Sequence, residues 1–562
     1  MDNRTIADLF EETADLLELH QENEFKSKAL RSAAFAISKY PDPITGMNIS
    51  ELSSMKGIGK SIAAKIVEIA TTGNLQERTD LLSITPKGLL ELFEVKGLGP
   101  KKISMLWKGL SVESPGELLY ACNENRLLTL KGFSEKSQSE IKKSLEFKAA
   151  HQGLFHYAAA EKTLQLFLST LSSIPFQFPI EVVGEMRRKC EVIKNIHLAT
   201  SATSIDFVEH EPSITSNHFT FKSTEDSKLV LASIDGPGIE ISLNVPSSGW
   251  HLMKMIGPDD HVQEISGRIP NLDDKLDLLW SESEIYSNAG LTYVLPELRD
   301  LPVQRIIDLQ SQSKSFVEYG ELKGCLHNHS TYSDGASSLK DMALAAQQEG
   351  LQYFAICDHS KSAFYAGGLK EEDIIRQHLE IDRLNKELSP FRIFKGIESD
   401  ILPDGSLDYA DDVLASFEIV VASIHSGLNM DLEKATNRLI KAIENPFTTI
   451  LGHPTGRLLL SRQGYPIDHL KVLDACAANG VAVELNAHPY RLDMDWRWLH
   501  HAVERGVMVS INPDAHHVSG ITDMQYGVHV ARKAGLFKSD VLNGLDLEAF
   551  IQWLQTKKTG IV

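Results

Sequence analysis

The sequence predicts three successive folds: an all-helical region, an α+β region and a distorted α/β barrel of seven strand–helix pairs. Residues 1–150 place apolar side chains three and four positions apart, without strand-like alternation. Residues 151–305 mix helical patterns with short β-branched runs. From residue 320 to 562, strand and helix patterns alternate, which is typical of a parallel sheet wrapped by helices. We therefore expect domains at 1–150, 151–305 and 320–562.

Length and charge agree with several domains and limit the partners. The chain has 562 residues, more than one hydrophobic core usually organises. Its net charge of −20 disfavours broad wrapping of nucleic acid. Residues 52–110 depart from this average, with nine Lys and Arg against five Asp and Glu. A local basic patch in an acidic protein points to a restricted nucleic-acid contact.

The cysteines and the N-terminus bear on the compartment. The five cysteines form no CxxC pair, which fits a reduced cytoplasm. No apolar run approaches the length that crosses a bilayer, and the acidic amphipathic start is unlike a targeting peptide. We expect a cytoplasmic protein without membrane contact. The sequence leaves the oligomeric state open, with a monomer as the simplest expectation.

Two segments of the helical region repeat each other: LSSMKGIGKSIAAKIVEI at 52–69 and LFEVKGLGPKKISMLWKGL at 92–110. Each places Lys-Gly-hydrophobic-Gly between two short helices, where small residues let a phosphate approach free N–H groups. This pattern resembles the helix-hairpin-helix motif, which grips the DNA backbone without reading bases. The expected partner is DNA, at ends, gaps or single strands. The candidate contacts are Gly57, Gly59, Lys60, Lys65, Gly97, Gly99, Lys101 and Lys102.

A third copy, LLTLKGFSEKSQSEI at 127–141, has Ser134 in place of the second glycine, so we interpret it as degenerate. The segment at 22–41 resembles the N-terminal helical domain of family X DNA polymerases. That resemblance places Lys65 where some members carry a Schiff-base lysine. A phosphate contact is the commoner role for a lysine on a DNA-facing helix, and lyase chemistry stays open.

The middle region resembles the family X polymerase palm, on the segment FPIEVVGEMRRKCEVIKNIHLAT, and we expect strands at IEVVG, DFVEH and IEISLNV. Gly184, Arg187 and Arg188 of the palm signature remain. The three metal-binding acids of the family fall on Asn195, His197 and Ser242. Glu240 or Asp206 could substitute, but neither recreates a pair of acids on one strand face. We expect a retained scaffold that has lost polymerase activity.

The C-terminal third ends almost every expected strand in a metal-binding side chain. Barrel enzymes place their sites at the carboxyl ends of the strands, so these side chains should converge. The runs are GCLHNHS, YFAICDHS, FRIFKGIESD, EIVVASIHS, TTILGHP, VAVELNAHP and VMVSINPDAH. Imidazole with carboxylate suits zinc, manganese or iron. The candidate ligands are His327, His329, Asp334, His359, Glu398, His425, His453, Asp514 and His516.

These segments resemble the PHP domain (polymerase and histidinol phosphatase), and the order of the three regions resembles bacterial polymerase X. The resemblance implies three divalent ions and divides the ligands among them. His327, His329, Glu398 and Asp514 would hold the first ion. Glu398 would bridge to a second, also held by His425 and His453. Asp334, His359 and His516 would hold the third.

Two of the ligands, Glu398 and Asp514, are also expected to be catalytic, together with Arg457. Arg457 and Arg491 are placed to touch a phosphate. His488 could support a ligand. His500 and His501 fall in a helical stretch, where packing is the expected role.

The function these patterns favour is a metal-dependent phosphoesterase acting on DNA. By family resemblance it would be a 3′→5′ exonuclease that processes 3′ ends in DNA repair. One alternative is a small-molecule phosphomonoesterase that resembles histidinol phosphatase, and another is a non-catalytic scaffold that binds DNA ends. The helix-hairpin-helix repeats argue against the first, because a metabolite enzyme has no use for a grip on the DNA backbone.

Overall fold

A computed structural model describes residues 2–40, 42–215, 218–234, 236–246, 248–270 and 280–559. The end residues 1 and 562 of the predicted domains lie outside these ranges. The chain divides into two compact units, Met1–Gln152 and Gly153–Val562, and each is described by itself. The further division of the second unit near residues 305–320 stays a prediction. Among the described residues, no helix is long and apolar enough to cross a membrane.

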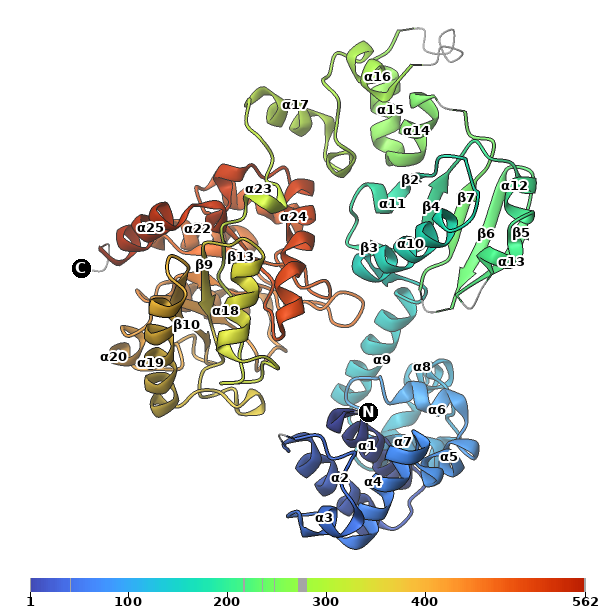
Figure 1. Cartoon of the computed structure of the whole chain (residues 1–562), viewed down its shortest axis with the longest axis vertical. Helices are drawn as coiled ribbons and strands as arrows, with labels where there is room; N and C mark the ends of the chain where they lie inside the picture. The colour runs from blue at the N-terminus through green and yellow to red at the C-terminus, as the bar shows by residue number, and fades with distance from the viewer. Residues whose placement is uncertain are drawn as a thin grey trace. The chain divides into compact units, whose positions relative to one another are not determined.

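The first unit is helical, as predicted (Figure 1). Asp2 and Asn23 accept hydrogen bonds from the first backbone N–H groups of α1 and α2 and so fix where these helices begin. The buried faces of the helices meet in one apolar core. Its α-helices are α1 Asn3–Leu19, α2 Glu24–Ser38, α3 Ile49–Ser54, α4 Lys60–Thr72, α5 Gln76–Ser83, α6 Lys87–Leu92, α7 Pro100–Leu110, α8 Pro115–Asn123 and α9 Glu135–Ala150.

The second unit begins with an α+β region, which confirms the predicted class. Its five-stranded sheet has the order β2-β4-β7-β6-β5, in which β4 and β7 run parallel. The strands of the whole α+β region are β1 Phe155–His156, β2 Glu181–Val183, β3 Val192–Ile193, β4 Ile196–Ala199, β5 Phe219–Thr224, β6 Lys228–Ser233 and β7 Ile239–Ser242. Its α-helices are α10 Tyr157–Ser172, α11 Gly184–Arg187, α12 Ser204–Val208, α13 Glu211–Ile214, α14 Gly249–Ile256, α15 Asp259–Gly267, α16 Glu282–Asn288 and α17 Val303–Ser311.

One strand predicted in this region is wrong. DFVEH lies mostly in helix α12, because Thr203 and Asp206 form a reciprocal capping box that begins a helix there. Local capping therefore outweighs the short apolar run that suggested a strand.

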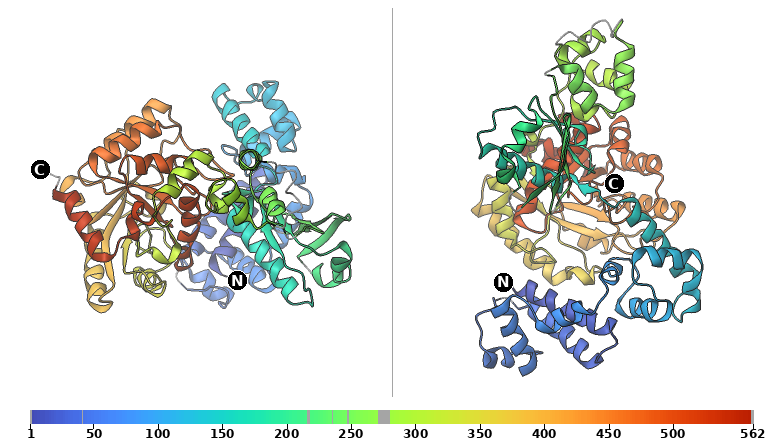
Figure 2. Two further views of the ribbon diagram at one scale, coloured as in Figure 1. Left: turned by 90° about the horizontal axis from the view of Figure 1, so that it is seen from above. Right: turned by 90° about the vertical axis from the view of Figure 1, so that its right-hand side faces the viewer.

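The C-terminal region is a nearly closed barrel of seven parallel strands in sequence order, within the described part of the chain. A parallel bridge between Asn328 and Ala515 joins the two edges of the sheet. The yellow-to-red helices lie around the outside of the strands (Figure 2). The strands are β8 Gly324–Cys325, β9 Tyr353–Ile356, β10 Arg392–Asp400, β11 Ile419–Ser423, β12 Ile450–Leu451, β13 Ala482–Asn486 and β14 Val509–Asn512. The α-helices are α18 Leu339–Gln348, α19 Glu371–Glu387, α20 Asp411–Leu414, α21 Leu432–Ile443, α22 His469–Asn479, α23 Trp496–Glu504, α24 Met524–Lys533 and α25 Leu547–Thr559.

The barrel interior is apolar where the strands begin. Tyr353, Phe394 and Phe550 belong to one buried cluster, and the rings of Tyr353 and Phe550 stack with centroids 4.7 Å apart. Phe550 comes from α25, so the C-terminal helix packs against this end of the barrel. The opposite end, where the strands finish, is left for polar side chains.

Candidate metal centre and nucleic-acid interface

The nine predicted ligands converge at the carboxyl ends of the barrel strands. Residues at the ends of β8, β9, β11, β12 and β14, in β10 and in the loop after β8 supply them. Two of them, His453 with φ of 21° and Asp514 with φ of 53°, have left-handed backbone conformations that cost energy for residues with a side chain. Such strain at two ligand positions is typical of a functional site.

Glu398 lies at the centre of the group and is almost completely buried. Its Oε1 lies 3.0 Å from Nε2 of His453, 3.2 Å from Nε2 of His425 and 3.3 Å from Nε2 of His327. Its Oε2 lies 2.9 Å from Nδ1 of His359 and 3.6 Å from Nε2 of His329. One carboxylate therefore reaches five imidazoles, as a bridging ligand would.

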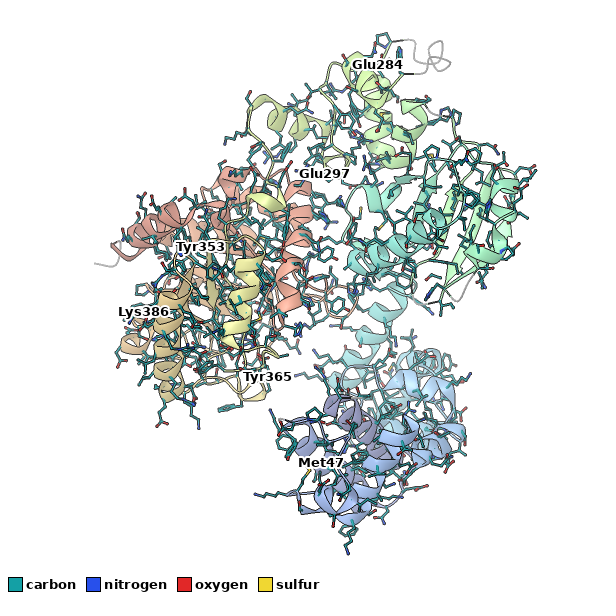
Figure 3. All side chains as sticks on the ribbon, in the orientation of Figure 1. Met47, Glu284, Glu297, Tyr353, Tyr365 and Lys386 are labelled. Carbon is teal, nitrogen blue, oxygen red and sulfur yellow. The ribbon has the colours of Figure 1, made fainter. Side chains whose placement is uncertain are left out.

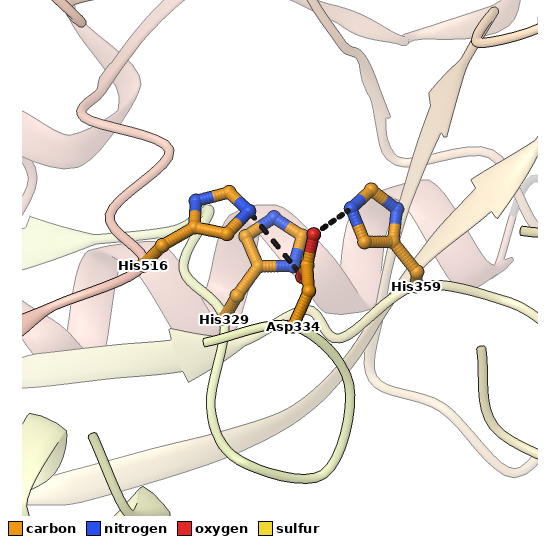
Figure 4. A group of neighbouring side chains, drawn as sticks. All are labelled: His329, Asp334, His359 and His516. Atoms are coloured by element: carbon orange, nitrogen blue, oxygen red, sulfur yellow. Dashed lines mark ion pairs between the residues drawn. The ribbon is translucent and has the colours of Figure 1, made fainter. Parts of the chain in front are cut away.

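A second carboxylate, Asp334, organises the outer part of the centre (Figure 4). Its Oδ2 lies 3.5 Å from Nε2 of His359, and its Oδ1 lies 3.4 Å from Nε2 of His516. His329 lies between this group and Asp514, whose Oδ1 is 3.0 Å from Nε2 of His329. The inner and outer groups are therefore continuous.

The donor atoms fit divalent cations. Buried Nδ1 of His329 has no hydrogen-bond partner, and buried Nε2 of His327 and Oε2 of Glu398 form no well-aligned hydrogen bond with the polar atoms near them, a costly state that a cation would relieve. In three overlapping sets the ligand atoms all lie within 4.8 Å of one another. These sets are His329 with Asp334, His359 and His516; His327 with His329 and Asp514; and His359 with Glu398 and His425. Nitrogen and carboxylate donors together suit zinc, manganese or iron.

Without a bound cation, the histidines of the centre differ in whether they carry a proton. Burial, and then the neighbouring His516 and His359, lower the pKa of His329 to about 3 and keep this ring neutral. Burial acts the same way on His359 and His425, but the Glu398 carboxylate outweighs it and raises the pKa to about 10 and about 9 respectively. Metal ions would therefore displace protons from His359 and His425 when they bind.

Three buried carboxylates that the sequence analysis did not single out hold the ligands in place. Glu484 lies 2.7 Å from Nδ1 of His327 and accepts the backbone N–H of His453. Asp400 lies 2.6 Å from Nδ1 of His425. Asp358 accepts hydrogen bonds from Ser330 and Ser333 in the loop that carries Asp334. Such partners fix the orientation of a ligand ring and strengthen its donor nitrogen.

The two candidate phosphate-binding arginines differ in what surrounds them. The guanidinium of Arg457 is half-buried and already bonded to Glu191, to Asp495 at 2.7 Å and to the carbonyls of Arg491 and Leu492. Arg491 instead has its Nε 3.7 Å from Oδ2 of Asp514. This arrangement favours a positioning role for Arg457 and leaves Arg491 as the better placed phosphate contact.

The other predicted positions of the barrel are accounted for. His500 and His501 lie on α23, where they form a half-exposed group with Glu504 that also could hold an ion. Arg305 lies 3.3 Å from this Glu504, and its positive charge disfavours a cation there. His488 is partly buried in the loop after β13, beside Tyr490.

The rim also carries an aromatic side chain that the sequence analysis overlooked. The ring of Tyr365 lies 6.1 Å from that of His359. The residue is 71% exposed, so its ring stands in solvent beside the metal centre. Adjacent aromatics in SAFYAGGL are the signal that could have revealed this position.

The palm-like sheet brings together the positions expected to carry acids. His197 on β4 is in register with Glu240 on β7, and Ala199 is in register with Ser242. The Glu240 carboxylate accepts from Asn195 at 2.7 Å and pairs with Lys228 at 2.5 Å. Asn195, His197 and Ser242, which stand where the family has acids, carry no carboxylate. Among these residues and the neighbours described above, only Glu240 has one, and Lys228 already neutralises its charge.

Three turns of the first unit share one backbone geometry. Gly57, Gly97 and Gly132 have φ of 90°, 90° and 95°, which only glycine adopts without strain. Gly59 and Gly99 are the N-caps of α4 and α7. The third turn was predicted to be degenerate, yet Ser134 accepts the N–H of Ser137 and caps α9 in the same place. A serine side chain therefore replaces the second glycine there.

The predicted lysines surround these turns in different states. Lys60 is exposed at the start of α4. Lys101 lies 3.4 Å from Glu18, and Lys102 donates to the carbonyl of Gly97 at 3.0 Å. Lys65 is half-buried and paired with Glu77, which Lys26 also binds. The Lys65 amine is therefore already held by a carboxylate.

Comparisons with known proteins match each part of this arrangement. Family models match a helix-hairpin-helix domain at residues 1–75, a SAM-like helix-hairpin-helix tandem at 89–146 and a PHP domain at 326–488. The DNA polymerase/3′-5′ exonuclease PolX of Bacillus subtilis is 34% identical over 574 residues, covering 98% of this chain and 100% of that protein. Probable phosphatases of Thermoanaerobacter sp. and Acetivibrio thermocellus are 29% and 31% identical, over 42% and 29% of this chain and 95% and 65% of their own lengths.

Proposed function

The chain belongs to the bacterial polymerase X family, and from that premise we propose that its barrel removes nucleotides from the 3′ ends of DNA. The chain is a hydrolase of the phosphoesterase type. The observation that carries the proposal is the convergence of nine candidate ligands, with Glu398 at their centre, beside Arg491. A relative that matches 98% of the chain is named for a 3′-5′ exonuclease.

We assign three divalent ions to this centre, with Glu398 shared between two of them. The first is assigned to His327, His329, Glu398 and Asp514, the second to Glu398, His425 and His453, and the third to Asp334, His359 and His516. When bound, such ions act as Lewis acids that favour attack of water on a phosphate and offset its charge. Asp400 and Glu484 orient the imidazoles, and Arg491 positions a phosphate oxygen.

We assign the grip on DNA to the first unit. Its three hairpin turns present backbone N–H groups at the starts of α4, α7 and α9, where an anion is favoured. The contacts go to phosphates and are sequence-independent, which suits binding at ends, gaps or single strands by a monomer. The five free cysteines fit a cytoplasmic repair enzyme.

Chain extension is absent in this proposal. Two-metal nucleotide transfer needs several carboxylates on one face, whereas the palm-like face offers Glu240, which Lys228 already pairs with. We assign the zinc, manganese or iron ions to the hydrolytic centre of the barrel.

The second candidate is a small-molecule phosphomonoesterase, which the probable phosphatases favour because they match the barrel. These relatives cover 42% or less of the chain, and the match of helix-hairpin-helix models to the first unit favours DNA instead. A non-catalytic scaffold is the third candidate, and strained ligand positions with unpartnered donor atoms argue against it.

One experiment separates the three candidates. Full-length metal-loaded protein is incubated with oligonucleotides labelled at the 3′ or the 5′ end, and separately with histidinol phosphate. We expect immediate release of the 3′ label, a ladder that shortens from the 3′ end of the 5′-labelled strand, and no phosphate from histidinol phosphate. Phosphate release from histidinol phosphate alone would contradict the proposal, and so would binding of DNA without cleavage.

A further inference from the structure

Two adjacent aromatic side chains stand exposed at the rim of the barrel. Phe364 and Tyr365 lie in a short 3₁₀ turn, Phe364–Ala366, and have 88% and 71% of their surfaces exposed. Figure 3 shows Tyr365 at the edge of the C-terminal region. The turn follows the metal-centre residue His359, whose ring lies 6.1 Å from that of Tyr365. Single exposed aromatics are common, but an adjacent pair beside a metal centre needs an explanation.

The loop that carries the pair is fixed at both ends. The N–H of Leu369 donates to the carbonyl of His359 at 2.9 Å, and the N–H of Gly368 donates to Ala363 at 3.1 Å. Ser362 donates its N–H to Asp408 at 2.6 Å and its hydroxyl to Asp400 at 3.0 Å. A side chain at Gly368 would place its Cβ 1.8 Å from the carbonyl oxygen of Ser360. The fold therefore holds the two rings in solvent.

The positions of the neighbouring charges define what these rings could bind. In the barrel order, β9 and β13 are separated by β10, β11 and β12, so the loops that follow them leave different sides of the rim. The first loop carries the two aromatics, and the second carries Arg491, next to Asp514. A phosphate between Arg491 and the metal centre would leave the rest of its nucleotide free to extend toward the aromatic pair.

We propose that Phe364 and Tyr365 form a stacking subsite for a nucleobase of the DNA strand whose phosphodiester is cleaved. The subsite rests on the proposed function and names the chemical class that the site prefers, a phosphodiester whose terminal nucleotide carries a base. Every base has a π-face, so such a subsite accepts all four bases. A base-free phosphate gains nothing from it.

The test uses full-length metal-loaded protein and two oligonucleotides that differ in the 3′-terminal residue, thymidine or base-free tetrahydrofuran. The wild-type protein should cleave the thymidine end with the higher kcat/KM. Replacement of both aromatics, Phe364→Leu with Tyr365→Leu, should lower kcat/KM for the thymidine end about tenfold, as loss of one stacked base does. Its kcat/KM for the base-free end should change less than about twofold.

Three further variants distinguish stacking from a structural role. Phe364→Trp keeps an aromatic face and should retain the preference for thymidine, and Tyr365→Phe should retain it as well. Ile375→Ala removes another exposed apolar side chain, 62% exposed on α19, and should leave both rates unchanged. An equal loss on both ends in the double leucine variant would overturn the subsite, and so would unchanged rates. Wild-type protein that cleaves both ends equally overturns the subsite alone, whereas wild-type protein that cleaves neither contradicts the proposed function too.

Discussion

The palm-like sheet and the barrel both bring polar positions together at a sheet, but they keep very different amounts of charge. The palm-like face retains Glu240, half-exposed and paired with Lys228 at 2.5 Å. The barrel retains Asp334, Glu398 and Asp514 among six histidines, with Glu398 and Asp514 buried. Further buried acids, Glu484 and Asp400, stand behind them. The barrel therefore offers three clustered carboxylates with buried acids behind them, whereas the palm-like face offers one carboxylate that is already paired.

The palm-like region also contacts the barrel through ion pairs. Glu191, next to β3, pairs with Arg457 of the barrel, and Lys533 of α24 pairs with Asp300. Arg457 in turn holds the carbonyl of Arg491 at 3.0 Å, in the loop beside Asp514. The palm-like region therefore braces the rim loop that carries Arg491.

The largest expected effect comes from the centre of the barrel. Glu398→Gln keeps the volume of the side chain but removes the charge that lies among five imidazoles, so repulsion between bound cations is uncompensated. We expect loss of metal from the purified protein and DNA cleavage near background, with duplex binding retained. Metal analysis measures the loss of metal, and 3′-label release measures the cleavage. His500→Ala on α23 is the matched control. Near-normal cleavage by Glu398→Gln would mean that the active centre lies elsewhere.

A large effect on stability should come from the brace. Glu191→Ala removes one of the two carboxylates that pair with the largely buried Arg457 and leaves Asp495 as the other, so we expect a loss below the about 3–5 kcal/mol typical of a buried pair that is broken completely. The free energy of unfolding from urea titration measures this loss, and the exposed Glu181→Ala on β2 serves as control. The double variant with Arg457→Met should recover part of the stability, because the guanidinium that lost Glu191 is then gone and Arg497 still pairs with Asp495. Equal stability of Glu191→Ala and the wild type would show that the Glu191–Arg457 pair does not stabilise the contact between the palm-like region and the barrel.

The smallest expected effect concerns DNA affinity. Replacing Lys60, Lys101 and Lys102 by alanine should weaken duplex binding and flatten its log–log salt dependence by about one unit for each phosphate that the variant no longer neutralises. The metal content should not change. Titrations at several salt concentrations give the slope, with the exposed barrel residue Lys386→Ala as control. An unchanged slope would show that the hairpin lysines do not contact phosphates.

Strand-terminal side chains could be predicted from the sequence because each one follows a recognisable apolar run. The seven barrel strands and the meeting of their nine ligands follow from that pattern. The division of ligands among ions did not follow from spacing, because Glu398 contacts five histidines that come from four strand ends. Glu484 and Asp400 were missed because an acid within a strand gives no sign of the ring it will orient.

Two other differences come from interactions that no local pattern contains. Arg457 looked like a phosphate contact, but its partner Glu191 lies 266 residues away in the sequence. Ser134 looked like the loss of a motif, but its hydroxyl caps α9 where the other copies use glycine. Sequence patterns therefore identify backbone geometry and ligand types well, whereas the partners of charged side chains depend on the assembled fold.

The most direct test of the central claim compares an acid in each region after the same change from acid to amide. Glu240→Gln alters the palm-like face, and Asp514→Asn alters the barrel centre, in otherwise identical full-length protein. The initial rate of 3′-label release is measured for both with the same metal-loaded preparation. We predict that Glu240→Gln keeps this rate within about twofold of wild type and that Asp514→Asn reduces it to background. A strong loss in Glu240→Gln together with near-normal release by Asp514→Asn would contradict the account.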